Sequence, residues 1–537
     1  MESEQLQNFN ERLSQWVANQ GFWFQVRYSM SGSGMKGRAM FHLLRMGFRL
    51  LIFLALVALG TWIYLERRTN TERFRTGLKD AVREGMAAED FDARGISRAR
   101  GRLEIGRFAA VGGNETFFSS MEARNVRCKM GLVDGLLGVW EPGIVTISRL
   151  DLDLRAGAED EEAAAKIAEA VFHKSSKVEV NSFEIADATI RWGYSEPTRG
   201  GIENSALSVQ RTPTGWRMVF KGGTFYQNWL HDLDIVALTV LCEPSGILFE
   251  KAEFKSGAAS VEFPSLRVSG NATPEVKGSA KIRNLPLDKI LPSAASDFLE
   301  GTISGDFRLF GSTNTSDGVG FSGEVVLDGT DVITLRERIH LLKALSVVDG
   351  VRNYKRVDFR EGTFDLKTSG GGMAVTNVDL KSEDLFSLTG AMLVRLPTEE
   401  EKSQAMTQAG VGGGWIGGDE GASEFGPWGR SGLTLRDAAT AKAANSDEVS
   451  LFDKLDLAAD NRILGLQAAE RLSRMLRYEG KFRISIPGDA FDGAAELVRL
   501  HPRDPATGRI LLDVPIEGFL YELTLKQAED LYQQGQR

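Results

Sequence analysis

The chain contains 537 residues, more than one compact hydrophobic core normally holds, so its length predicts several structural units. The net charge of −9 comes from interspersed acidic and basic residues, and this balance excludes an extended basic surface for nucleic acid. Glycine is abundant at 58 residues, many of them in strand-like segments where tight turns require them. Cys128 and Cys242 are the only cysteines, so the sequence allows either one disulfide or two buried free thiols.

An uncharged apolar run, LLIFLALVALGTWIYL, extends from Leu50 to Leu65. At about 1.5 Å per residue it covers roughly 24 Å, and extension to Met46 brings it close to the roughly 30 Å of a bilayer core. A cleaved signal peptide is disfavoured because the run begins far from Met1, and the basic residues on both sides disfavour a buried core helix. We therefore expect a transmembrane helix at residues 46–65. The charges that flank it do not indicate its orientation in the membrane.

The regions on either side of this run differ in pattern. Residues 1–45 are a polar extension with several aromatic side chains, and either a membrane-surface segment or a small helix fits them. We expect residues 66–100 to form a charged helical connector. Alternation of apolar and polar residues then predicts a β-rich region at residues 101–284, interrupted by a helix at residues 159–172.

This alternation changes phase twice within VEVNSFEIADATIRW, residues 178–192. Asn181, Ser182 and Asp187 stand where the phase breaks, and such residues favour turns. We interpret the stretch as several very short strands that fold back on one another and share one apolar face. Four side chains are predicted on that face, namely Val178, Val180, Phe183 and Ile185.

An ordered series of glycine-containing strand motifs occupies residues 285–396. A helix-like segment, LPLDKILPSAASDFL, leads into the strand EGTISGDFRLFG, and the hairpin motif FSGEVVLDG follows. After a second helix-like segment, LRERIHLLKALSVV, the strand motif returns as EGTFDLKTSGG, and the series ends in LTGAMLVRL. This series resembles the carboxy-terminal module of the AsmA-like proteins, in which glycines occupy the positions found here at 301, 305, 323, 329, 362 and 390.

AsmA-like proteins, with their relatives TamB and YhdP, are anchored in the inner membrane of the Gram-negative envelope, where their curved sheet forms a groove proposed to carry phospholipid. The resemblance implies a mainly β fold with a few helices and one N-terminal transmembrane helix. Its sheet would be elongated, curved and antiparallel, a β-taco or half-barrel groove of many short strands. The groove candidates in this module are Ile303, Phe307, Leu309, Val325, Leu327, Phe364, Leu366 and Leu380.

The resemblance also implies a location and a function. The protein would be a single-pass inner-membrane protein whose C-terminal domain lies in the periplasm. It would bind or conduct phospholipid in support of outer-membrane assembly, with an outer-membrane or envelope protein as a partner. The alternation leaves a second interpretation open, because two tightly packed sheets show the same pattern. In that case the protein is a membrane-anchored scaffold of an envelope or secretion assembly that conducts no lipid.

The last part of the chain departs from the strand pattern. Residues 397–448 are rich in glycine, and their composition predicts a disordered insertion. Residues 449–537 are predicted to form a helix that ends near residue 478, then two closing strands and a final helix. In the first of these helices, apolar residues recur at steps of four, at Leu464, Ala468, Leu472 and Leu476.

The sequence contains no motif for catalysis or cofactor binding. None of its five histidines stands at ligand spacing from another histidine or a cysteine, which argues against a zinc or iron site. The GxGxxG match at Gly412, Gly414 and Gly417 lacks the preceding strand and following helix that a dinucleotide site needs. We therefore expect a protein that is not an enzyme, with no cofactor, no metal and no nucleic-acid partner.

Overall fold

The computed structural model describes residues 2–535 except 22, 25–26, 29–34, 69–70, 132–139, 173–177, 195–197, 292–294, 297, 337–338, 399, 402–450, 453–475 and 520–524. The chain divides into two compact units, Met1–Thr76 and Gly77–Arg537. The first unit is helical, with α1 at Glu2–Ala18 and α3 at Met35–Arg68. Within α3, the stretch Arg45–Arg68 is long and apolar enough to cross a membrane and is not buried by protein. This stretch contains the segment predicted to span the membrane.

The connector after α3 is only partly helical. α4 covers Glu72–Gly85, and two strands follow at once, β1 at Ala88–Arg94 and β2 at Ser97–Ala99. Lys79 of α4 forms an ion pair of 2.7 Å with Asp92 of β1, which ties the helix to the first strand. The prediction of a helical connector up to residue 100 is therefore wrong for its last third.

The second unit is built on one sheet that contains all 20 strands of the described residues. The next strands are β3 (Arg102–Gly112), β4 (Phe118–Lys129), β5 (Trp140–Leu154), β6 (Val178–Trp192), β7 (Gly200–Arg211), β8 (Trp216–Lys221), β9 (Thr224–Gln227), β10 (Leu230–Glu243) and β11 (Gly246–Ser256). They are followed by β12 (Ala259–Ser269), β13 (Val276–Pro286), β14 (Leu299–Gly311), β15 (Val319–Arg336), β16 (Arg356–Ser369), β17 (Gly372–Ser382), β18 (Phe386–Arg395), β19 (Arg477–Ile486) and β20 (Ile510–Phe519). The helical elements between and after them are α5 (Glu161–Phe172), η2 (Leu287–Lys289), α6 (His340–Asp349), α10 (Ala495–Leu500) and α11 (Leu525–Gly535).

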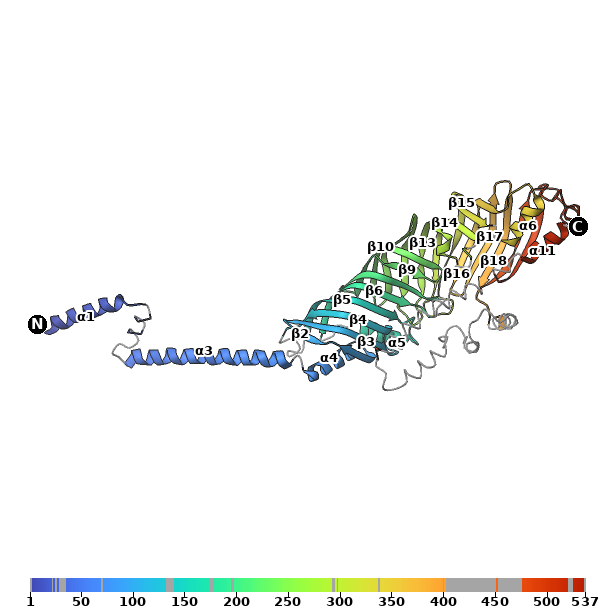
Figure 1. The fold of residues 1–537 in the computed structure, drawn as a ribbon. Coiled ribbons are helices and arrows are strands. Elements are labelled where there is room, and N and C mark those ends of the chain that lie inside the picture. Colours follow the sequence, from blue (N-terminus) through green and yellow to red (C-terminus); the bar gives the residue numbers. More distant parts are fainter. Residues whose placement is uncertain are drawn as a thin grey trace, which may run out of the picture. The chain divides into compact units, whose positions relative to one another are not determined.

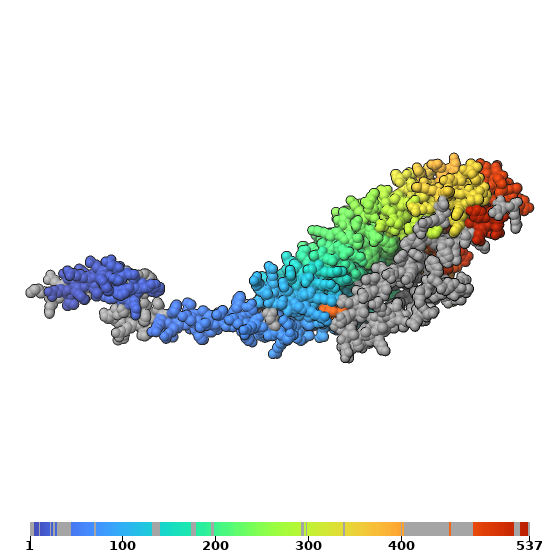
Figure 2. Space-filling view, viewed as in Figure 1, coloured from blue at the N-terminus to red at the C-terminus, as the bar shows by residue number. Residues whose placement is uncertain are grey.

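The strands pair in nearly the order in which they occur in the chain (Figure 1). β1 and β2 both pair with β3, and β8 and β9 share the place between β7 and β10. Within the second unit, the colours in Figure 2 therefore run in sequence order along the sheet. All described pairings are antiparallel except β5 with β6, where α5 provides the crossover that a parallel pair requires. The chain is thus mainly β with a few helices, as predicted.

β6 is a single strand, although its sequence predicts several short ones. Opposite β5, Asn181 is an extra residue, because Gly143 pairs with Val180 and the next residue of β5 pairs with Ser182. Opposite β7, the register shifts again between Ile185 and Ala188. Each extra residue turns the following side chains to the other face without ending the strand. The phase changes therefore mark bulges, and the prediction of turns inside this stretch is wrong.

Two predicted helices of the 285–396 region are shorter than their patterns indicate. The first contains only the three-residue η2 among its described positions, and β14 already begins at Leu299. In the second, Leu335 belongs to β15, and α6 begins at His340. Strand pairing on both sides of these segments therefore outweighs their helical pattern at the boundaries.

The end of the chain confirms the two closing strands and the last helix, as β19, β20 and α11. The helix predicted from residue 449 is wrong at its end, because Arg477 and Tyr478 belong to β19. Its positions Leu464, Ala468 and Leu472 lie outside the described residues, as do residues 402–448 of the predicted insertion.

Two glycines make room for a phenylalanine on the sheet. A Cβ atom at Gly323 would lie 2.7 Å from Cδ1 of Phe307 and 2.5 Å from the carbonyl oxygen of Asp306. A Cβ atom at Gly305 would lie 2.9 Å from Cε2 of the same ring. Phe307 is only 2% exposed and packs edge-on against Phe321, with ring centroids 5.3 Å apart. These glycines of the predicted motif therefore serve close packing on neighbouring strands.

We expect Gly323→Ala to destabilise the second unit by about 1–3 kcal/mol, because the ring and the carbonyl must both shift. Gly493→Ala is the matched control, since nothing lies within 4 Å of the Cβ atom it would add. The measurement is thermal unfolding of the detergent-solubilised full chain. Equal melting temperatures for the two variants would contradict the packing described for Phe307.

Candidate functional site

One side of the sheet carries buried apolar side chains on successive strands. In the ladder, Val325 of β15 lies opposite Phe364 of β16. Gly323 lies between Phe307 of β14 and Leu366 of β16. We call this side the apolar face, and all eight residues predicted from β14 to β17 are buried, namely Ile303, Phe307, Leu309, Val325, Leu327, Phe364, Leu366 and Leu380.

The four residues predicted on β6 are less uniform. Ile185 is buried, and its neighbours in the ladder are Ile147 and Leu207. Val180 and Phe183 are half-buried, and the Phe183 ring lies 6.0 Å from that of Trp216. Val178 is the first residue of β6, but its side chain is outside the described set. The apolar face is therefore more open at the start of β6 than at β14–β16.

The apolar face continues beyond the predicted residues in both directions. Towards the amino terminus, Ala123 of β4 is paired with Phe108 of β3 and with Leu150 of β5. Towards the carboxy terminus, Phe482 of β19 is paired with Val514 of β20. The face is thus continuous from β3 to β20, and the sequence patterns identified only part of it.

The other side of the sheet is polar. On β3 and β4, Arg107 donates two hydrogen bonds of 2.9 Å to the carboxylate of Glu122. On β5 and β6, Arg191 forms ion pairs with Asp151 at 2.5 Å and with Asp153 at 3.3 Å. Because these charges are paired across neighbouring strands, they favour the observed register and leave this side suited to water.

An apolar pair from far along the chain lies on this polar side. Phe452 is fully buried against Ala109 of β3, and Leu451 belongs to the same cluster. The Cζ atoms of Arg94 and Arg107 lie 4.4 and 4.6 Å from the centre of the Phe452 ring, a cation–π arrangement. Sequence reasoning missed this contact, and its only signal is an apolar pair at the start of the predicted helix.

The sheet bends towards its apolar face at β9–β12. In a flat sheet, three strand spacings would separate β9 from β12 by about 14 Å. The rings of Phe225 on β9 and Phe263 on β12 are nevertheless only 6.2 Å apart, and both contact Phe254 of β11. A cluster this tight requires curvature, because side chains on the same side of a flat sheet point in parallel directions.

This curvature brings opposite margins of the sheet together. One margin holds the ends of β5, β6 and β9, and the other holds the β12–β13, β14–β15 and β16–β17 turns, because antiparallel strands alternate in direction. The indole nitrogen of Trp229 donates a 2.7 Å hydrogen bond to the carbonyl oxygen of Ser369, across six strand spacings, about 29 Å in a flat sheet. Thr313 donates a 2.6 Å hydrogen bond to the carbonyl oxygen of Ala156. We call this line of contacts the turn seam.

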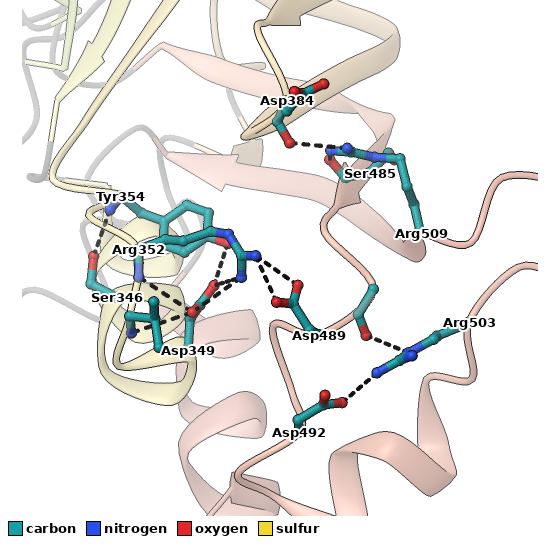
Figure 3. Close-up of polar contacts among 12 residues, drawn as sticks. Ser346, Asp349, Arg352, Tyr354, Asp384, Ser485, Asp489, Asp492, Arg503 and Arg509 are labelled. Atoms are coloured by element: carbon teal, nitrogen blue, oxygen red, sulfur yellow. Dashed lines mark hydrogen bonds and ion pairs between the residues drawn. The ribbon is translucent and has the colours of Figure 1, made fainter.

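A polar cluster holds α6 to the connection between β19 and β20 (Figure 3). The carboxylate of Asp349, only 2% exposed, accepts hydrogen bonds from Arg352 and, at 2.7 Å, from the hydroxyl of Tyr354. Arg352 reaches across to Asp489, donating to both carboxylate oxygens at 2.7 and 2.8 Å. We call these residues the α6 clasp.

The clasp and the cysteines show how burial and pairing change ionisation. The hydrogen bond from Arg352 lowers the pKa of Asp489, whereas burial and the nearby Asp349 raise the pKa of Tyr354. Cys128 and Cys242 are both free thiols, and burial raises the pKa of each to about 11. The sequence allows either a disulfide or two free thiols, and the structure shows two free thiols whose raised pKa makes them poorly reactive.

No family model matches the chain, and neither the curated proteins nor the solved structures contain a match. Among the described residues, no three His, Cys, Asp or Glu side chains lie close enough together to hold a metal ion. The resemblance to the AsmA-like proteins consequently remains a prediction. The candidate site is defined by its geometry alone, as a continuous apolar face whose opposite margins meet at the turn seam.

We expect Arg352→Gln to destabilise the second unit by about 2 kcal/mol, because it leaves the buried carboxylate of Asp349 without its cation. Arg503→Gln is the matched control, since Arg503 pairs with Asp492 where both side chains are more than half exposed. Its loss should stay below about 1 kcal/mol. Chemical denaturation of the full chain measures both, and equal losses would show that the clasp is no stronger than a surface pair.

Proposed function

We propose that this chain is a membrane-anchored protein whose apolar face binds or conducts the acyl chains of phospholipid. The observation that carries the proposal is the continuity of the apolar face from β3 to β20 in a chain whose helix α3 is long and apolar enough to span a membrane. Removing apolar surface from water is favourable by about 25 cal/mol of free energy per Å². Acyl chains that cover the apolar face would provide this stabilisation without any catalytic group.

The compartment and the partner belong to the same proposal and rest on the resemblance to AsmA-like proteins. Residues 1–45 would lie in the cytoplasm, and the second unit would lie in the periplasm of a Gram-negative envelope. The curved sheet would then form a lipid groove with an outer-membrane or envelope protein at its far end. The charges beside the membrane span give no orientation of their own, because basic residues flank it on both sides.

The topology is tested with reporter fusions after α4, near residue 86. Alkaline phosphatase, which folds only in an oxidising compartment, should be active there. Green fluorescent protein or another cytoplasmic reporter fused at the same site should be inactive when exported. The opposite result would place the second unit in the cytoplasm and remove the envelope part of the proposal.

A second candidate function is a scaffold that conducts no lipid, and the packing at β14–β16 favours it. Ile303 and Val325 have no exposed surface, and the Phe307 ring is pressed against two glycines. Side chains of the protein fill the apolar face there, as they do in an ordinary core. The two functions thus differ in what contacts the less tightly filled part of the apolar face: phospholipid in the first, and only the protein's own side chains in the second. Phe183 on β6 lies in that part and is the best probe of it.

We expect a photoreactive benzoylphenylalanine at Phe183 to form a covalent adduct with phospholipid when cells are irradiated. Glu184 is the matched control, because the next residue of a strand faces the polar side. Mass spectrometry of the purified full chain identifies the adduct. A phospholipid adduct at Phe183 and none at Glu184 supports lipid binding. Absence of any lipid adduct at Phe183, with equal photochemical activation at both positions, would favour the scaffold.

A further inference from the structure

The turn seam differs from every other junction within the sheet. Neighbouring strands are joined by ladders of backbone hydrogen bonds, and each ladder fixes a whole strand. The margins are joined mainly by single bonds from side chains of one margin to backbone carbonyls of the other. Opening the seam would therefore leave all the described strand pairs intact.

The donors of the seam come from both margins. From the β14–β15 turn, Thr313 donates to Ala156, and the amide of Asn314 donates to the carbonyl oxygen of Ala158 at 3.4 Å. From the β9–β10 turn, the indole of Trp229 donates to Ser369, and the amide of Asn228 donates to the carbonyl oxygen of Val319. These four side-chain donors are uncharged, and their acceptors are backbone carbonyl oxygens. Between the end of β5 and the β12–β13 turn, the Ala158 N–H also donates to the carbonyl oxygen of Ala272 at 3.1 Å, and the Ala272 N–H donates to the carboxylate of Glu161 at 3.2 Å.

Glycines allow the margins to approach closely. A Cβ atom at Gly157 would lie 2.8 Å from Cβ of Asn314, and one at Gly318 would lie 2.7 Å from Cβ of Thr198. A Cβ atom at Gly370 would lie 2.5 Å from Cγ2 of Thr198. The turns of the two margins are thus complementary in shape, because each glycine leaves room for a side chain of the opposite margin.

We propose that the turn seam is a lateral entrance, which opens to let acyl chains reach the apolar face from the side. This inference rests on the proposed lipid binding and specifies how the site is reached. Sideways entry leaves the polar headgroup in water, whereas threading along the face would bury it without partners. On opening, the side chains of Thr313, Asn314, Asn228 and Trp229 lose their carbonyl acceptors and become donors for the phosphate and ester oxygens of a phospholipid.

A reversible disulfide across the seam tests the inference. The double variant Gly157→Cys with Asn314→Cys places one cysteine on each margin of the seam. Moving their two Cβ atoms apart by less than about 1 Å gives the usual Cβ separation of a disulfide. Ser265→Cys with Ser279→Cys is the matched control, because these residues face each other in the β12–β13 ladder with hydroxyl oxygens 3.0 Å apart. Of the native thiols, Cys128 is buried and Cys242 is half-buried, and a pKa raised to about 11 keeps both out of the reaction.

The readout is loading of the full chain with NBD-phosphatidylethanolamine from vesicles of phosphatidylethanolamine and phosphatidylglycerol. Oxidation of the seam pair should slow loading by about tenfold or more, and dithiothreitol should restore it, as expected for a gated site. Oxidation of the ladder pair should leave the rate unchanged. Each single-cysteine variant of the seam is compared with itself, and oxidation should leave its loading rate equal to that of its reduced form.

Three results would overturn the inference. Equal loading of the oxidised and reduced seam pair would show that lipid enters elsewhere, with lipid binding itself intact. Failure of the seam pair to oxidise would contradict the close approach of the margins. No loading of the unmodified chain would overturn the proposed lipid binding, and the lateral entrance with it.

Discussion

Every strand from β3 to β19 has neighbours on both sides, so backbone hydrogen bonding extends the sheet through the second unit without a break. A sheet of this kind can hide an apolar side only by bending towards it or by being covered. The aromatic cluster of β9, β11 and β12 shows the bend, and the meeting of opposite margins follows from it. The other features of the unit adapt to this curvature.

Glycines and bulges are the local means of adaptation. Gly305 and Gly323 let the Phe307 ring lie directly over neighbouring backbone. The bulges of β6 reset which side chains face inwards, so that a long strand keeps apolar residues on the curved side. Where these glycines let side chains pack directly on the sheet, the protein's own side chains fill the apolar face. Where β6 begins, Val180 and Phe183 remain half-buried.

Three kinds of junction hold this unit together. The ladders resist separation because each includes many backbone bonds formed together. The turn seam depends on a few single hydrogen bonds, most of them from neutral side chains, and such a bond contributes about 1 kcal/mol net. The α6 clasp and the Phe452 contact are a third kind, in which charged groups hold distant parts of the chain against the sheet. In the proposed function, the first kind would supply the framework and the second would supply the access.

The sequence by itself determined the elements that depend on near neighbours. Period-two alternation is a local consequence of strand geometry, so the β-rich region was predictable, and the apolar run of α3 follows from composition alone. It did not distinguish a turn from a bulge in β6, because both shift the phase and only the partner strand separates them. It also could not show the turn seam or the site of Phe452. Thr313 lies 157 positions from Ala156, and contacts at such separations depend on how far the whole sheet bends. Only the tertiary structure decides that curvature, since it sums small twists and bulges over many strands.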